Sequence, residues 1–72
     1  MTKLERFIKD HEISPLVLAR ESGVSRQHLL RVRKGIMEPT RRVMVLIAGG
    51  CSRLVGRRVK VASLFNIAVR WR

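Results

Sequence analysis

Apolar residues recur at helical spacing along the first eleven positions of the chain. The positions at i, i+3 and i+4 are Leu4, Phe7 and Ile8, and His11 is a candidate for the position at i+7. They form one stripe of a helix of about three turns that faces a core. Thr2 and Glu5 have the spacing of a capping box, in which the hydroxyl accepts from the Glu5 amide and the carboxylate reaches back to the Thr2 amide. We expect this helix to begin at residue 2, with His11 bonding to carbonyl groups at its end.

Two short helices are predicted next. Ser14 is a good N-cap and Pro15 suits the first helical position, so a helix is expected from there to about residue 22. Gly23 ends it by adopting a positive φ. Ser25 then opens a helix over residues 25–34, which stops at Gly35. Two helices joined by a tight glycine turn are typical of a helix-turn-helix.

The second half of the chain predicts two more helices. After a loop over residues 36–39, Thr40 caps a helix whose apolar positions are Val43, Met44, Ile47, Ala48 and Cys51. Gly49 and Gly50 each weaken it by about 1 kcal/mol relative to Ala, so it could kink, end there or accept a close neighbour. A last short helix over residues 61–65 would close the core with Leu64 and Phe65.

No stretch alternates between apolar and polar residues as a strand does, so the fold class is all-α. Five helices in 72 residues make one compact domain, which we place at residues 1–67, followed by a basic tail at residues 68–72. The core candidates on the fourth helix are Met44, Ile47 and Ala48. Val45 or Leu46 could instead form a dimer surface, with Ile67, Val69 and Trp71 from the end of the chain.

The charge is large and unevenly distributed. Sixteen Lys and Arg residues against five Asp and Glu residues give a net charge of +11, and twelve of the cations are Arg. Residues 1–24 are neutral overall, so the whole excess lies in residues 25–72. Such an excess indicates a polyanionic partner, and the arginine bias favours nucleic acid, because guanidinium groups bond phosphates and guanine edges in pairs.

The inventory of reactive residues argues against an enzyme. Cys51 is the only cysteine, there are two histidines, and the carboxylates do not cluster, so we expect no metal site, no cofactor and no small-molecule ligand. A single cysteine provides no disulfide framework, which fits a cytoplasmic protein. The longest apolar run, residues 43–51, is less than half a membrane span, so no membrane partner is expected.

The sequence resembles the Cro/C1-type helix-turn-helix family of phage-repressor-like DNA-binding domains over about residues 2–67. The matching positions are Leu18-Ala19, Gly23-Val24-Ser25, Leu29, Val32, Gly35, Pro39-Thr40, Ile47-Ala48 and Leu64-Phe65. The resemblance implies a five-helix domain whose third helix enters the major groove of DNA, usually as a homodimer on a two-fold-symmetric operator. One departure is Pro15, which stands where the family often has a polar side chain.

A helical projection of about 100° per residue divides the helix at residues 25–34 into two faces. Ser25 and Val32 lie within about 60° of Leu29, so these three define the buried side. The outward positions are Gln27, Leu30, Arg31 and Lys34, with Arg26 and Arg33 on one flank, near the buried side, and His28 on the other. Gln suits adenine, Arg suits guanine and an exposed Leu suits a thymine methyl.

We therefore predict two sets of DNA contacts. The resemblance places Arg26, Gln27 and Arg31 at the family's usual base-contacting positions, and Leu30 joins them by its outward direction. The residues predicted to contact phosphates are Ser25, His28, Lys34, Arg41 and Arg42. Arg41 and Arg42 occupy the first turn of a helix, where cations are disfavoured by the helix dipole, and an arrangement that costs stability indicates a use. Arg53, Arg57, Arg58 and Lys60 either extend this surface or are simply solvated.

The predicted function is a sequence-specific transcriptional regulator that binds double-stranded DNA as a homodimer. A small basic RNA-binding protein is the main alternative, because phosphate attraction alone does not distinguish DNA from RNA. Single-stranded RNA readers depend on stacking aromatic residues, however, and this chain has two Phe and one Trp. An antitoxin-like module that binds another protein could have the same fold.

Overall fold

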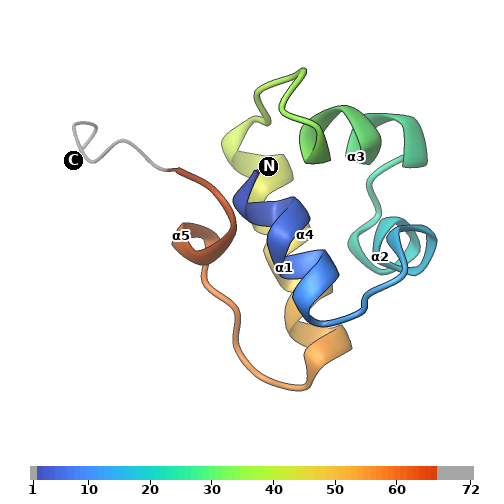
Figure 1. Ribbon diagram of the computed structural model, residues 1–72, viewed down its shortest axis with the longest axis vertical. Coiled ribbons are helices and arrows are strands. Elements are labelled where there is room, and N and C mark those ends of the chain that lie inside the picture. Colours follow the sequence, from blue (N-terminus) through green and yellow to red (C-terminus); the bar gives the residue numbers. More distant parts are fainter. Residues whose placement is uncertain (1, 67–72) are drawn as a thin grey trace.

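The computed structural model describes residues 2–66, in which five helices and no strands are present. The helices are α1 Lys3–Asp10, α2 Pro15–Ser22, α3 Arg26–Arg33, α4 Arg41–Val55 and α5 Val61–Leu64. The prediction of an all-α fold is confirmed. In Figure 1, α1 lies across the front of α4, with α2 and α3 on one side and α5 on the other. The predicted tail at residues 68–72, together with Ile67, lies outside the described residues.

The four longer helices begin where the capping residues predict. Thr2, Ser14, Ser25 and Thr40 are the N-caps, and each side-chain oxygen accepts a hydrogen bond from the backbone amide three residues later, at 3.0, 3.4, 3.1 and 3.2 Å respectively. Each bond satisfies one amide that has no partner within the helix. The chain leaves α2 and α4 through Gly23 and Gly56, whose φ values are 77° and 76°.

The core lies between the helices and holds one or more side chains from each. The buried hydrophobic residues are Leu4, Ile8, Leu18, Ala19, Val24, Leu29, Val32, Ile47, Ala48, Cys51, Val59 and Leu64. The expected burial of Ile47 and Ala48 is confirmed, whereas Met44 is half-buried. Val59 was not anticipated as a core residue. It sits in the segment between α4 and α5, and its amide donates to the Ser52 hydroxyl at 2.8 Å, which fastens this segment to α4.

The helix α4 runs without interruption through its two glycines, although a kink or an early end was equally open from the sequence. Gly50 is buried against α2: a Cβ atom at this position would lie 3.1 Å from Leu18 Cδ1 and from Ser22 Cβ, and 3.2 Å from Ser22 Cα. A Cβ atom at Gly49 would meet only the end of the Arg53 side chain, at 3.7 Å. Gly50 is therefore the position at which α2 and α4 approach closely.

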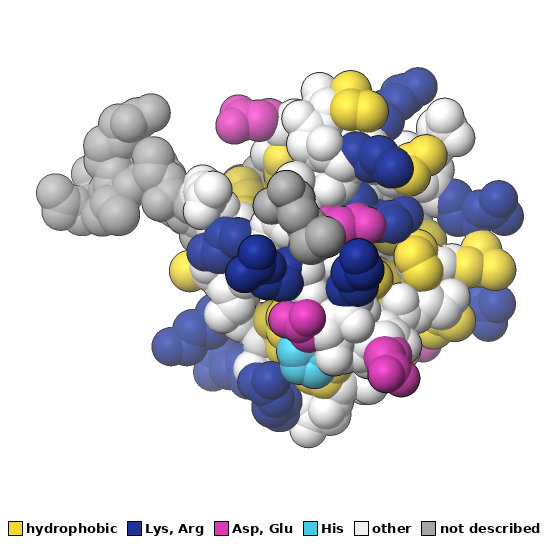
Figure 2. All heavy atoms as spheres, viewed as in Figure 1, with side chains coloured by type: hydrophobic (Ala, Val, Ile, Leu, Met, Phe, Trp, Pro, Cys, Tyr) yellow, Lys and Arg dark blue, Asp and Glu magenta, His cyan; other side chains and the backbone are white. Residues whose placement is uncertain are grey.

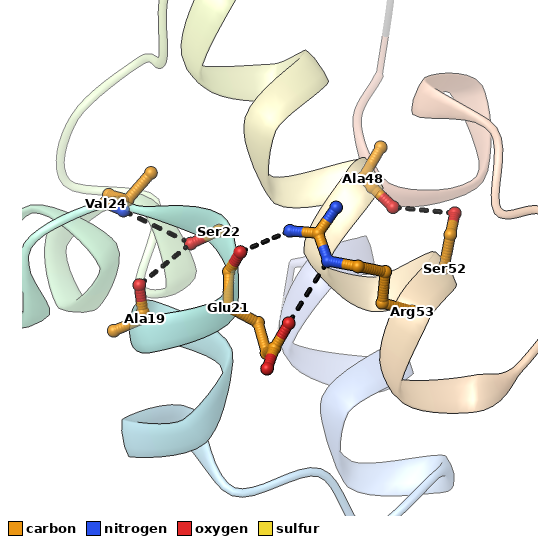
Figure 3. Close-up of polar contacts among 7 residues, drawn as sticks. All are labelled: Ala19, Glu21, Ser22, Val24, Ala48, Ser52 and Arg53. Atoms are coloured by element: carbon orange, nitrogen blue, oxygen red, sulfur yellow. Dashed lines mark hydrogen bonds and ion pairs between the residues drawn. The ribbon is translucent and has the colours of Figure 1, made fainter.

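Polar contacts hold the end of α2 together and join it to the last turn of α4 (Figure 3). The buried Ser22 hydroxyl donates to the Ala19 carbonyl and accepts from the Val24 amide, both at 3.3 Å. Beside it, Arg53 of α4 reaches Glu21 twice, with its Nε 3.1 Å from the carboxylate and its Nη2 bonded to the Glu21 carbonyl. The orientation of α2, and of the helix that follows it, is thus fixed against α4 by both packing and hydrogen bonds.

Two sequence-based expectations about the chain's polar residues are wrong. The Glu5 carboxylate, which was expected to reach back to the Thr2 amide, accepts hydrogen bonds from the Arg33 guanidinium at both oxygens. Ser25, which was grouped with the buried side of its helix, is exposed, because as the N-cap it lies outside the helix and turns its hydroxyl to the His28 amide. The expected role of His11 is confirmed, since its Nδ1 lies 3.1 Å from the Phe7 carbonyl oxygen.

Candidate nucleic-acid interface

The helix α3 divides into the two faces that its sequence predicts. Leu29 and Val32 point into the core and are 1% and 4% exposed. The side chains predicted to contact bases are all exposed, namely Arg26, Gln27, Leu30 and Arg31. With eight residues, α3 is about 12 Å long, and the DNA major groove is wide enough to admit the diameter of an α-helix.

The predicted phosphate contacts differ in their accessibility. Ser25 and Lys34 are exposed at the two ends of α3, and Lys34 is the C-cap residue rather than part of the helix. His28 is half-buried. Arg41 and Arg42 are exposed in the first turn of α4, which contains no acidic residue. The positive end of the α4 dipole and two guanidinium groups therefore coincide at one place on the surface.

Arg33 has a structural role that the sequence did not reveal. Its Nε lies 2.9 Å from Glu5 Oε1 and its Nη2 lies 3.1 Å from Glu5 Oε2, so one guanidinium group binds both carboxylate oxygens. The two side chains are only 17% and 27% exposed. Paired and partly buried in this way, Arg33 joins α3 to α1 and is not an outward-facing contact.

Thr2 strengthens the same junction at the backbone. Its hydroxyl accepts from the Glu5 amide at 3.0 Å and donates to the Arg33 carbonyl oxygen at 2.6 Å. One residue thus caps the start of α1 and satisfies a carbonyl group at the end of α3. A signal for this junction was present in the sequence, because the helical projection puts Arg33 at the edge of the buried side of α3. Its acidic partner could not be chosen among the five without the tertiary fold.

The remaining cations of the basic half of the chain are not equivalent. Arg53 binds Glu21, and the terminal nitrogen of Arg57 lies 3.4 Å from Nε2 of His11. Arg58 and Lys60 are exposed. Arg53 thus has a partner on α2, and its guanidinium joins α2 to α4.

An open hollow of about 300 Å³ lies between the first turn of α2 and the side of α3 that faces it. Its lining residues are Pro15, Leu16, Arg26, Gln27, Leu29, Leu30 and Arg33. Three of the four predicted base-contacting side chains thus surround one depression. Figure 2 shows basic and hydrophobic side chains interspersed along the edge of the molecule that α2 and α3 form in Figure 1.

Leu16 is a member of this surface that the sequence reasoning missed. It is 49% exposed in the first turn of α2, where it follows Pro15. Its outward position could have been found from the projection of α2, because Leu18 and Ala19 define that helix's buried side.

Comparison with known proteins adds no relative to this picture: no protein-family model matches the chain, and no similar curated protein or solved structure was found. The resemblance to Cro/C1-type domains therefore stays a prediction from the residues. Within residues 2–66, no helix is long and apolar enough to cross a membrane. Over the same residues, no group of three or more His, Cys, Asp and Glu side chains could hold a metal ion.

Proposed function

We propose that this protein is a sequence-specific DNA-binding regulator of transcription that inserts α3 into the major groove. The observation that carries the proposal is the composition of one exposed helix face: Arg26, Gln27, Leu30 and Arg31 point away from the core on a helix whose other face is buried. Together these side chains offer a guanine reader, an adenine reader and an apolar contact for thymine.

Two further features support this function. The helices α2 and α3 are separated only by residues 23–25, and the left-handed Gly23 makes the short turn between them possible. This is the arrangement expected of a helix-turn-helix, in which the second helix reads the bases. The exposed Arg41 and Arg42 at the start of α4 supply the phosphate contacts that hold such a helix in register.

The proposal includes a homodimer, in which two copies of α3 lie one DNA turn apart, about 34 Å, on a palindromic operator. Val45 and Leu46 on α4 are 56% and 39% exposed and are available as part of the dimer surface. Their proposed partners Ile67, Val69 and Trp71 lie outside the described residues. In a cell, such a regulator would act in the cytoplasm, on the nucleoid.

The experiment begins with selection of a preferred site from a pool of random duplexes. Affinities for the selected and a scrambled duplex are then measured at several salt concentrations for the wild type, Arg31→Ala and Arg42→Ala. Arg31→Ala should lose about 5–150-fold affinity for the selected duplex and relax the preference at one base pair per half-site.

Arg42→Ala is the matched control, because it removes the same charge from a predicted phosphate contact. It should weaken binding to both duplexes equally and lower the slope of affinity against salt by about one unit per lost contact. If Arg31→Ala left the base preference intact while Arg42→Ala changed it, α3 would not be the reading helix. If the chain bound duplex RNA as tightly as selected DNA, the RNA-binding alternative would replace the proposal.

A further inference from the structure

The hollow between α2 and α3 is lined by both apolar and polar side chains, and some of the apolar ones are exposed to solvent. Leu16 and Leu30 keep 49% and 37% of their area exposed at its wall. A single exposed leucine is common on protein surfaces and needs no explanation. Here two leucines from different helices share one depression with Pro15, and Gln27 and Arg26 line the same depression.

The polar residues around the hollow limit what can occupy it. None of its lining residues is acidic. The Arg33 guanidinium is neutralised by the Glu5 carboxylate at 2.9 Å, so Arg26 is the lining cation without a carboxylate partner among the described residues. The occupant should therefore carry an apolar group, present hydrogen-bonding groups to an amide, and belong to an anionic molecule.

We propose that this hollow receives the 5-methyl group of a thymine, so that Leu16, Leu30 and Gln27 together make the protein select an A·T pair. The inference rests on the proposed function and adds its base specificity. In the major groove, an A·T pair displays the adenine N7 and N6 groups, which a glutamine amide binds in pairs, and the thymine methyl at the other end of the same edge. The other base pair carries hydrogen in place of that methyl group.

Pro15 gives the hollow its apolar character. It stands at the first position of α2 and has neither a side-chain donor nor a backbone N–H, so it contributes no hydrogen-bond donor to this corner of α2. Leu16 follows it and extends the apolar surface towards α3. The sequence alone favoured Leu30 as a thymine contact. The structure adds Leu16 of α2 as a second apolar side chain lining the same hollow.

The test uses the selected duplex and replaces its thymines one at a time by uracil, which lacks only the methyl group. At one position in each half-site, uracil should lower the affinity of the wild-type protein about fourfold, the value for burying one methyl group. Leu16→Ala and Leu30→Ala should bind thymine and uracil duplexes almost equally. Ile36→Ala is the matched control, since Ile36 is 73% exposed and does not line the hollow, and it should keep the wild-type ratio.

The outcomes separate this inference from the proposed function. If no uracil substitution lowered the affinity, or if both leucine variants kept the wild-type ratio, the hollow would not hold a thymine methyl, while preference for the selected duplex would still support DNA reading. If no duplex were preferred over random DNA, the proposed function and this inference would both fail. Circular dichroism of each variant verifies that these exposed substitutions leave the fold unchanged.

Discussion

The two adjacent glycines of α4 allow packing to be separated from helix propensity. Gly49→Ala and Gly50→Ala place the same methyl group at neighbouring positions of one helix interior, so each gains a similar propensity of about 0.8–1.0 kcal/mol. What differs is the space available. The new Cβ at Gly49 would lie 3.7 Å from the end of a flexible arginine, whereas at Gly50 it would lie 3.1 Å from two side-chain carbons of α2.

The magnitude follows from the neighbours of Gly50. Leu18 is fully buried, and the third contact, at 3.2 Å, is with the backbone Cα of Ser22, so neither can move aside without shifting α2. Overpacking of this kind costs about 1–3 kcal/mol. We therefore expect Gly49→Ala to raise the free energy of unfolding by up to about 1 kcal/mol. We expect Gly50→Ala to be less stable than Gly49→Ala by about 1–3 kcal/mol.

Urea denaturation followed by circular dichroism measures both variants against the wild type. A difference of 1 kcal/mol corresponds to about 4–8 °C in melting temperature for a domain of this size, so thermal unfolding provides an independent reading. Equal stability of the two variants would refute the reasoning, because it would mean that α2 does not approach α4 at Gly50.

Two further predictions concern buried and partly buried groups. In a double-mutant cycle with Glu5→Gln and Arg33→Met, followed by urea denaturation, the coupling free energy should be about 1 kcal/mol. This value is at the upper end for surface pairs, because the contact is bidentate and half-buried. A coupling free energy near zero would show that this pair does not join α1 to α3. Burial raises the pKa of the Cys51 thiol from 9.0 to about 11, so the unfolded chain loses this proton at a lower pH than the folded one. The free energy of unfolding should therefore fall by up to about 1.4 kcal/mol per pH unit between pH 9 and 11. Cys51→Ala should lack this part of the slope, and identical pH dependence of the two proteins would contradict the assignment.

The local structure was predictable where short-range chemistry decides it. Four helix starts were predictable to within one or two residues from their N-caps, Thr2, Ser14, Ser25 and Thr40. At each of them the side-chain hydroxyl accepts from a backbone amide three residues later that has no partner within the helix, an interaction that depends on neighbouring residues alone. The outward face of α3 was equally predictable, since burial of Leu29 and Val32 determines the direction of every other side chain on that helix.

The sequence failed where partners come from distant parts of the chain. The capping-box pattern assigned the Glu5 carboxylate to the Thr2 amide at the start of its own helix. In the structure the carboxylate instead accepts two charge-assisted hydrogen bonds from Arg33, 28 residues away in the sequence. Gly50 was ambiguous for the same reason. A glycine inside a helix lowers helix stability, and only the tertiary fold shows that Leu18 of α2 packs where a Cβ atom would lie. The hollow beside Leu16 depends on how α2 and α3 cross, which neither helix specifies alone.

The proposed reading of DNA requires α3 to be rigid while its outer side chains stay exposed, and a helix of eight residues is too short to be stable in isolation. Its rigidity has to come from its ends and its inner face. Ser25 caps the first turn, Leu29 and Val32 anchor the inner face, and the last turn is held at Arg33 by both its carbonyl and its guanidinium. The Arg33 guanidinium binds both carboxylate oxygens of Glu5 on α1, so its charge is paired within the domain, whereas Arg31 and Lys34 stay exposed on the outer side of α3.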